Sequence, residues 1–307
     1  MSADSPRWQA VELRDDGLVL RVTGMTDART LAVTVSGSQA AARRMLARGQ
    51  LKSGDATLRN DDQLPEGTLV ELSFHHAKPQ GACSSEPARV VYEDPVLLAA
   101  DKPARLLVHA DGTDADTLTA RVRGHLERAG RSVAAQAVQR LDVETTGLVL
   151  FSLAEEFQPA LDAQVAGHDM RKRYLAVTRG RLPVTPGEWL RIDAPIARDR
   201  HDARRMRVAR TGKPAQTMVR ELRREKGLSL LLVELLTGRK HQIRVHLAHE
   251  GCPLLGDGLY GGARHADGLM LHAWEERLTH PVTGEELCLR TEVPERFLRL
   301  FGPKAFA

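Results

Sequence analysis

The sequence predicts an α+β protein: a mixed, mainly antiparallel β-sheet with flanking helices, preceded by a small α+β domain. Apolar runs typical of strands, such as residues 89–92 and 96–100, are followed by scattered helical patterns without the regular alternation of a parallel α/β fold. A polar stretch rich in Pro, Gly and Ser interrupts these patterns at 75–87. We therefore expect a first domain at 1–74, a linker at 75–87 and a larger domain at 88–307.

The composition is that of an ordinary globular protein. Hydrophobic residues make up 42% of the 307 positions, charged residues make up 27%, and the formal net charge is +4. Any nucleic-acid surface is therefore expected to be a local basic patch. Apolar runs fall short of the roughly 18–20 residues that a membrane helix needs, and the polar N-terminus is unlike a signal peptide. We expect a monomer in the cytoplasm with no membrane partner.

Cysteine and histidine spacing predicts neither a disulfide framework nor a metal site. The cysteines Cys83, Cys252 and Cys288 are far apart and odd in number, which favours a reducing compartment. His241 and His249 do not follow the spacing of a zinc-binding helix, and no His-Glu-x-x-His occurs. We expect these histidines to be structural or exposed.

Secondary-structure signals place several elements in the larger domain. Helical patterns cover residues 117–129, with Asp116 as the expected cap, residues 155–167, and residues 241–250, which end before Gly251 and Pro253. Residues 217–222 and 229–236 read as a β-hairpin across the turn at 224–227.

The first domain carries one helix with a basic face. Residues 36–48 show a helical pattern with Ser38 as a cap, and Arg44, Arg48 and Lys52 follow at intervals of four. Residues 1–85 nevertheless contain equal numbers of basic and acidic residues. Both an RNA-binding surface and a neutral domain with one solvated basic face fit this pattern.

The segment 140–151 is the strongest candidate for chemistry. It places Asp142 in a polar loop that leads into a buried apolar strand, where a side chain can be held in fixed geometry. Arg140 supplies a positive charge two residues earlier and could keep the carboxylate ionised. Ion pairs at strand ends are often structural, so from these residues alone a catalytic site and a structural pair both stay open.

Six segments in a fixed order resemble the motifs of the RluA family of RNA pseudouridine synthases. They are residues 100–109, 140–151, 172–177, 237–246, 256–261 and 271–273. The resemblance covers roughly residues 88–296. The chain departs from the family pattern at Gln139, where histidine is usual, at Ala104-Arg105, where a small residue and glycine are usual, and at Lys240, where threonine is usual.

The resemblance implies that the protein isomerises uridine to pseudouridine in structured RNA and needs no cofactor. Asp142 matches the family's catalytic aspartate; attack on the sugar, attack on the base and removal of a sugar proton all stay open as its role. Tyr174 matches a tyrosine that stacks on the flipped uracil and could take the C5 proton. Arg244 is expected to bind Asp142 in a bidentate pair.

The same resemblance implies a set of substrate-binding residues. Arg140 lies two residues before the aspartate, and Leu271 corresponds to an apolar residue that lines the uracil pocket. Arg239 and Lys240 are expected at the start of a helix, with Lys240 and Arg244 on one face and a phosphate nearby. Residues 198–210 contain six arginines and match a hairpin that contacts RNA in the family, which makes Arg204 and Arg205 candidates for RNA binding.

The order of elements in residues 1–74 resembles the S4 RNA-binding module. An S4-like extension is typical of the members that act on ribosomal RNA, so large-subunit (23S) ribosomal RNA is the expected substrate. Two alternatives stay open: a synthase directed at tRNA, and a catalytically silent RNA-binding protein on the same fold. The replacement of histidine by Gln139 is the main reason to consider the catalytically silent protein as an alternative.

Overall fold

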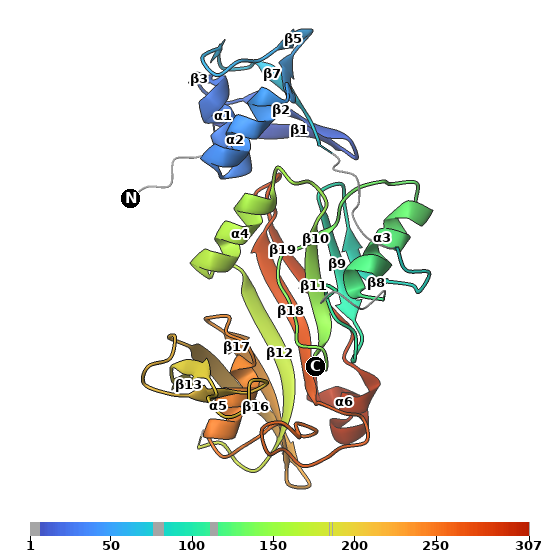
Figure 1. The fold of residues 1–307 in the computed structure, drawn as a ribbon, viewed down its shortest axis with the longest axis vertical. Helices are drawn as coiled ribbons and strands as arrows, with labels where there is room; N and C mark the ends of the chain where they lie inside the picture. The colour runs from blue at the N-terminus through green and yellow to red at the C-terminus, as the bar shows by residue number, and fades with distance from the viewer. Residues whose placement is uncertain (1–6, 76–82, 111–115, 184, 186, 307) are drawn as a thin grey trace.

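Two β-sheets, one in each part of the chain, form the framework of the protein (Figure 1). The computed structural model describes residues 7–75, 83–110, 116–183, 185 and 187–306. Residues 76–82 of the expected linker lie outside this part of the chain. Within the described residues, no helix is long and apolar enough to span a membrane.

The N-terminal sheet is antiparallel and is covered by a pair of short helices. Its strands are β1 (Trp8–Arg14), β2 (Gly17–Val22), β7 (Leu69–Ser73), β4 (Leu51–Ser53) and β5 (Ala56–Thr57), in that spatial order. A separate two-stranded pair, β3 (Thr26–Asp27) and β6 (Gln63–Leu64), precedes and follows the helices α1 (Ala28–Ser36) and α2 (Gln39–Ala47). The predicted cap of α2 is confirmed, because the Ser38 side chain accepts a hydrogen bond from the Ala41 backbone N–H.

The larger sheet is mixed and mainly antiparallel, as predicted. Its main path runs in the order β13 (Trp189–Asp193), β16 (Gln216–Glu225), β17 (Leu228–Leu235), β12 (Arg171–Arg179), β18 (Leu271–Thr279), β11 (Thr146–Ser152), β9 (Leu97–Lys102) and β8 (Arg89–Glu93). Strand β10 (Gln136–Ala137) pairs with β11, and β19 (Glu286–Arg290) pairs with β18. Strands β12, β18 and β11 are therefore neighbours in the middle of the sheet.

Helices and one small hairpin flank this sheet. They are α3 (Leu118–Arg128), α4 (Gln158–Gly167), α5 (Gln242–His249), α6 (Glu295–Phe301), the 3₁₀ turn η1 (Pro303–Ala305), and the hairpin of β14 (Ile196–Arg198) and β15 (Met206–Val208). The predicted cap of α3 is wrong. The Thr117 side chain accepts from the Ala120 N–H, whereas Asp116 pairs with Arg121 and Ser84.

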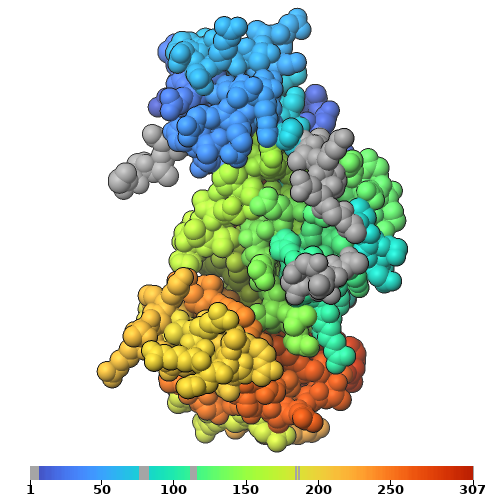
Figure 2. Space-filling model, in the orientation of Figure 1, coloured from blue at the N-terminus to red at the C-terminus, as the bar shows by residue number. Residues whose placement is uncertain are grey.

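The N-terminal part packs against the larger part near α4, where the blue and green regions meet in Figure 2. The rings of Phe74 and Phe157 meet edge to face, with centroids 5.8 Å apart. The buried Glu156 accepts hydrogen bonds from Gln50 Nε2 at 2.5 Å and from the His75 N–H at 2.8 Å. The two parts therefore share a hydrophobic core and a buried polar contact, which hold them together through more than the intervening segment.

Strand β11 lies at the centre of the hydrophobic packing. Alternation along the strand puts Leu148 and Leu150 in the cluster shared with the N-terminal part, and Val149 and Phe151 in the cluster that includes α3 and α5. Burial on both faces explains why this segment reads as a continuous apolar run. The strand's position fixes the loop that carries Asp142, which enters β11 directly.

Gly147 allows β11 to approach β18 where the two strands run parallel. It pairs with Ala273, its φ is +112°, and a Cβ at this position would lie 2.1 Å from the Ala273 carbonyl oxygen. A side chain cannot occupy that space without moving the backbone of one strand. Glycine here sets the distance between the Asp142 loop and β18.

We predict that Gly147→Ala lowers the free energy of unfolding by at least about 2 kcal/mol, because it adds a backbone clash to an unfavourable φ. Urea unfolding of the full chain measures the change. Gly227→Ala is the matched control, since Gly227 also has a positive φ of +76° but a Cβ there meets nothing within 4 Å. Equal losses in the two variants would show that the approach of β11 to β18 is not the constraint.

Candidate active site

Asp142 lies in the loop between β10 and β11, with its side chain 26% exposed. His241 Nε2 is 3.7 Å from one carboxylate oxygen, and Arg244 Nη1 is 3.6 Å from the other. Both partners come from the region of α5, about a hundred residues further along the chain. The fold thus brings a partly exposed carboxylate between an imidazole and a guanidinium.

The buried side chain of Lys102 binds the Asp142 loop through hydrogen bonds. The Lys102 ammonium donates to the carbonyl oxygens of Pro103, Leu106 and Val143 at 2.9, 2.8 and 3.0 Å, and its side chain is fully buried. Burial lowers the pKa of Lys102 to about 8. Because Val143 follows Asp142, this ammonium ties the end of β9 to the loop that carries the carboxylate.

The turn after Lys102 contains one departure from the family pattern. Arg105 has a φ of +61°, in the left-handed region that favours glycine, and its N–H donates to the Val143 carbonyl at 2.8 Å. A non-glycine residue in this conformation costs about 1 kcal/mol or more. The chain keeps the turn at this cost, and the Asp142 loop receives a second hydrogen bond.

Arg244 is oriented by Asp257. Its Nε and Nη2 donate to the two oxygens of Asp257, each at 2.8 Å, and the Asp257 side chain is fully buried. The predicted contact between Arg244 and Asp142 exists at 3.6 Å, but the prediction of a bidentate pair between them is wrong. The fork binds Asp257, which leaves Nη1 facing Asp142. Asp257 belongs to the segment 256–261, which was singled out as a motif in the sequence. The pairing of Asp257 with Arg244 was not predicted.

Tyr260, from the same segment, contacts the two residues that flank Asp142. Its hydroxyl lies 2.8 Å from His241 Nδ1, and the two rings meet edge to face. The Arg244 guanidinium lies 5.2 Å from the Tyr260 ring centroid, within the range of a cation–π contact. Neither His241 nor Tyr260 was predicted as a site residue; the signal that could have found them is their position inside two of the six motifs.

Tyr174 and Leu271 belong to the buried cluster next to the Asp142 loop. Tyr174 lies on β12, is 6% exposed and pairs with Ala273 of β18. Leu271 lies on β18 and is 3% exposed. Burial raises the pKa of the Tyr174 phenol, and the nearby carboxylates of Glu276 and Asp142 raise it further. The phenol therefore stays protonated at neutral pH, which argues against Tyr174 as the base for the C5 proton.

Gln139 forms hydrogen bonds with the buried carboxylate of Glu276. Its Nε2 donates to both oxygens of Glu276, at 2.6 and 2.8 Å. Burial raises the pKa of Glu276 to about 7, while burial of the nearby Lys172 lowers the pKa of that ammonium. The residue that departs from the family pattern thus supports the buried polar layer near Tyr174.

The expected substrate-binding cations lie at the surface around this centre. Arg140, Arg204, Arg239 and Lys240 are exposed, and Arg205 is half-buried with its guanidinium 5.5 Å from the Tyr260 ring centroid. The expected charge contact of Arg140 with Asp142 is absent among the described ion pairs, where Asp142 pairs with His241 and Arg244.

The start of α5 differs from the prediction. The helix begins at Gln242, after His241 in a left-handed conformation with φ +57°. Arg239 and Lys240 therefore precede the helix, and the expected shared helical face of Lys240 and Arg244 is wrong. The Gln242 side chain accepts from the Arg239 N–H and from the Thr237 hydroxyl, which shapes this turn.

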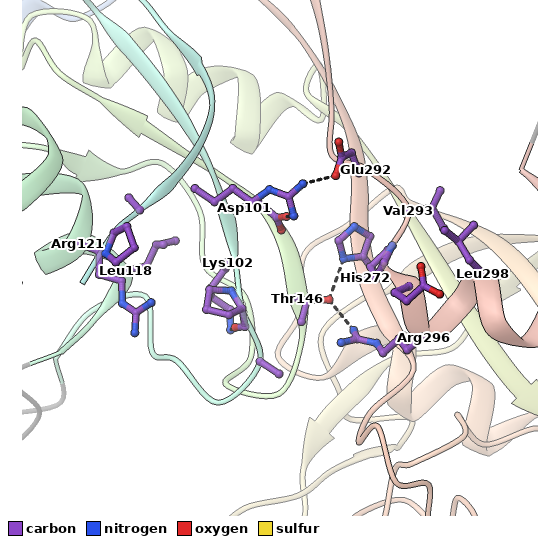
Figure 3. Close-up of a pocket in the computed structure, with 17 residues that line it drawn as sticks. Asp101, Lys102, Leu118, Arg121, Thr146, His272, Glu292, Val293, Arg296 and Leu298 are labelled. Atoms are coloured by element: carbon purple, nitrogen blue, oxygen red, sulfur yellow. Dashed lines mark hydrogen bonds and ion pairs between the residues drawn. The ribbon is translucent and has the colours of Figure 1, made fainter. Parts of the chain in front are cut away.

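A cavity of about 870 Å³ opens on the other face of the sheet, and Figure 3 shows its lining. His272 lines it and, by alternation along β18, points away from the face of Leu271 and Ala273. The Thr146 hydroxyl is 2.8 Å from His272 Nδ1 and accepts from Arg296 Nη2 at 2.6 Å. Lys102, which holds the Asp142 loop, also lines this cavity, whereas Asp142, His241 and Arg244 are not among its lining residues.

The described residues hold no group of three or more His, Cys, Asp or Glu side chains that could bind a metal ion. The three cysteines are free; Cys83 and Cys288 are exposed and Cys252 is buried.

Comparisons with known proteins agree with this fold. The family model described as RNA pseudouridylate synthase matches residues 96–249. Proteins named ribosomal large subunit pseudouridine synthase D from Xanthomonas campestris and Pseudomonas aeruginosa are 36% and 35% identical; the first match covers 82% of each chain and the second 83% of each. The solved structure of human RNA Pseudouridylate Synthase Domain Containing 1 is similar with a TM-score of 0.57 at 25% identity, over 69% of this chain and 85% of that one.

The mixed sheet and the motifs define a protein of the pseudouridine synthase class. The chain belongs to the RNA pseudouridylate synthase family, so its activity is that of an RNA pseudouridine synthase. The family resemblance and the α+β class predicted from the sequence are both confirmed.

The buried Glu276 generates a prediction about stability and pH. Its pKa in the folded protein is raised to about 7 from the usual 4.5, so the folded state holds a proton that the unfolded chain releases. The resulting stabilisation is complete below pH 4.5 and is lost as the pH rises to about 7. Glu276→Gln should therefore gain stability relative to the wild type between pH 5 and 7, by an amount on the order of 2 kcal/mol.

Urea unfolding of both proteins across this pH range measures the difference. Glu71→Gln, on an exposed position of β7, is the control and should keep the wild-type pH dependence. A Glu276→Gln curve parallel to that of the wild type would contradict the prediction.

Proposed function

We propose that this enzyme isomerises uridine to pseudouridine in large-subunit ribosomal RNA, with Asp142 as the catalytic carboxylate. The observation that carries the proposal is the geometry of Asp142, which is partly exposed and flanked by His241 at 3.7 Å and Arg244 at 3.6 Å. The choice of RNA is supported by relatives named for the ribosomal large subunit that match most of this chain.

The reaction breaks the N1–C1′ bond, joins C1′ to C5, removes the C5 proton and leaves a proton on N1. Atoms are rearranged within one nucleotide without net oxidation, so we propose that protein side chains suffice and that no cofactor takes part. The carboxylate of Asp142 acts on the nucleotide, the Arg244 guanidinium balances the charge that changes around it, and the His241 imidazole lies next to the carboxylate. Since Asp142 is partly exposed and the Tyr174 phenol stays protonated, Asp142 is better suited than Tyr174 to take the C5 proton.

Tyr174 and Leu271 are proposed as the apolar contact surface for the uracil. A uridine inside a folded RNA must leave its stack before a protein carboxylate can reach its glycosidic bond. The buried aromatic ring of Tyr174 and the side chain of Leu271 would receive such a base, since a planar base gains contact energy on an aromatic surface. Arg244, held by Asp257, would keep its remaining N–H groups near the carboxylate during this step.

The exposed cations are proposed to bind RNA phosphates. Arg204 and Arg205 lie in the segment between β14 and β15, in the yellow region of Figure 2. Arg204 pairs with Asp202 at 2.8 Å, and its side chain is 79% exposed, so it can exchange this partner for a phosphate at little cost. Arg140, Arg239 and Lys240 would extend the same surface around Asp142.

Residues 1–74 are proposed as an S4-like RNA-binding domain, joined by residues 75–87 to a catalytic domain at 88–307. Arg43 and Arg44 are exposed on α2, whereas Arg48 of the same face pairs with Glu155 of the larger part. We propose that the protein acts as a monomer in the cytoplasm.

Asp142→Asn is predicted to abolish pseudouridine formation while leaving RNA affinity within a few fold, because the amide keeps the shape but not the charge of the carboxylate. The measurements are release of tritium from [5-³H]uridine-labelled large-subunit RNA and a filter-binding titration. Glu144→Gln is the matched control: it removes the neighbouring carboxylate of the same loop and should keep activity. Normal turnover in Asp142→Asn would overturn the assignment.

Pseudouridine mapping of total RNA from cells with and without this gene tests the substrate. We expect the loss of a signal in large-subunit ribosomal RNA. Loss confined to tRNA would replace the proposal with a tRNA-directed synthase. No change in any RNA would favour a catalytically silent RNA-binding protein.

A further inference from the structure

We propose that Tyr260 is a positioning residue that sets the tautomer of His241 and so aims an imidazole N–H at Asp142. The inference rests on the proposed role of Asp142 and deepens it. It concerns two side chains, His241 and Tyr260, to which the reaction scheme above gives no chemical role.

The hydroxyl of Tyr260 has two partners that can be assigned from chemistry. The Met206 backbone N–H lies 2.8 Å from Tyr260 Oη and can only donate to it. The second partner of this hydroxyl is His241 Nδ1, also at 2.8 Å. Among the described hydrogen bonds no other acceptor receives the phenol proton, and Tyr260 is only 7% exposed. The phenol therefore donates its proton to His241 Nδ1.

The direction of this hydrogen bond decides where His241 carries its own proton. A neutral imidazole has one N–H, and Nδ1 is occupied as an acceptor, so the proton is on Nε2. His241 Nε2 is the atom that faces Asp142 Oδ1 at 3.7 Å. The N–H is thus aimed at the carboxylate from slightly beyond hydrogen-bond distance, as is common before a substrate closes a site.

The surroundings favour the neutral forms that this arrangement requires. Burial lowers the pKa of His241, and the cations of Arg244 and Lys240 lower it further. The carboxylates of Asp142 and Asp257 act in the opposite direction, and the net pKa is lowered. Burial likewise raises the pKa of the Tyr260 phenol. At neutral pH the phenol keeps its proton and the imidazole is uncharged, so the donor and the acceptor are both available.

The ring of Tyr260 also restrains the other partner of Asp142. The Arg244 guanidinium lies 5.2 Å from its centroid and the Arg205 guanidinium 5.5 Å from it. The Met206 N–H comes from β15, the hairpin proposed to bind RNA. One tyrosine therefore connects this hairpin to both His241 and Arg244. The backbone donor of Met206 fixes the direction of the phenol proton, which then fixes the imidazole.

Tyr260→Phe is the direct test, because it removes the hydroxyl and keeps the ring that Arg244 and Arg205 contact. We expect the ring ¹⁵N chemical shifts of His241, measured by NMR and assigned with His241→Gln, to change from a single Nε2–H tautomer to a mixture. Under single-turnover conditions the rate of pseudouridine formation should fall about tenfold, while the affinity for RNA stays within twofold.

Tyr92→Phe is the matched control, since it removes another tyrosine hydroxyl, the one that hydrogen bonds to Asp94 away from the site. It should leave both the His241 tautomer and the rate unchanged. An unchanged tautomer in Tyr260→Phe, or an unchanged rate, would overturn the proposal.

A double-mutant cycle separates action through His241 from a general loss of packing. A glutamine at position 241 offers an amide N–H near the position of Nε2 without needing a partner at Nδ1. Adding Tyr260→Phe to His241→Gln should therefore cause little further loss of rate, whereas the same loss in both backgrounds would overturn the inference. The tautomer measurement needs no RNA, so it tests Tyr260 even if the proposed role of Asp142 fails in Asp142→Asn.

Discussion

The close approach of β11 to β18 is the constraint on which the site depends. Gly147 faces the Ala273 carbonyl with no room for a side chain, so the two parallel strands can approach closely at the point where the Asp142 loop enters the sheet. Strand β18 carries Leu271 and pairs with β12, which carries Tyr174. The distance between the carboxylate loop and the proposed uracil surface is therefore set by backbone packing at one glycine.

Buried polar contacts then fix the groups that packing alone would leave free to move. The Lys102 ammonium donates hydrogen bonds to three carbonyl oxygens around the Asp142 loop. Asp257 accepts two hydrogen bonds from the Arg244 guanidinium, and the Gln139 amide donates to the carboxylate of Glu276. Each of these groups would be costly to bury without its partner, so each stabilises one arrangement of the side chains over others. The partly exposed Asp142 stands at the edge of this network, where a substrate can reach it.

Two of the three departures from the family pattern, Gln139 and Arg105, are accommodated by the same packing. Gln139 donates to a buried carboxylate through its amide, a hydrogen bond that needs no ionised imidazole. Arg105 adopts the left-handed conformation that glycine usually supplies, and its N–H still reaches the Val143 carbonyl. Neither substitution removes the contacts that hold the Asp142 loop.

The sequence by itself determined the class of fold, the family and the segment that contains Asp142, because these depend on local patterns and on motifs in a fixed order. It also predicted Tyr174, Leu271 and Arg244 as site residues from their motif positions, and this assignment stays a prediction. Only the tertiary structure decided that Asp257 takes the fork of Arg244, that Tyr260 contacts His241, and that α5 starts after Lys240. These contacts join segments that are separated along the chain or depend on how one turn is hydrogen bonded. Sequence spacing carries no information about either, since partners are chosen by distance and direction in the folded protein.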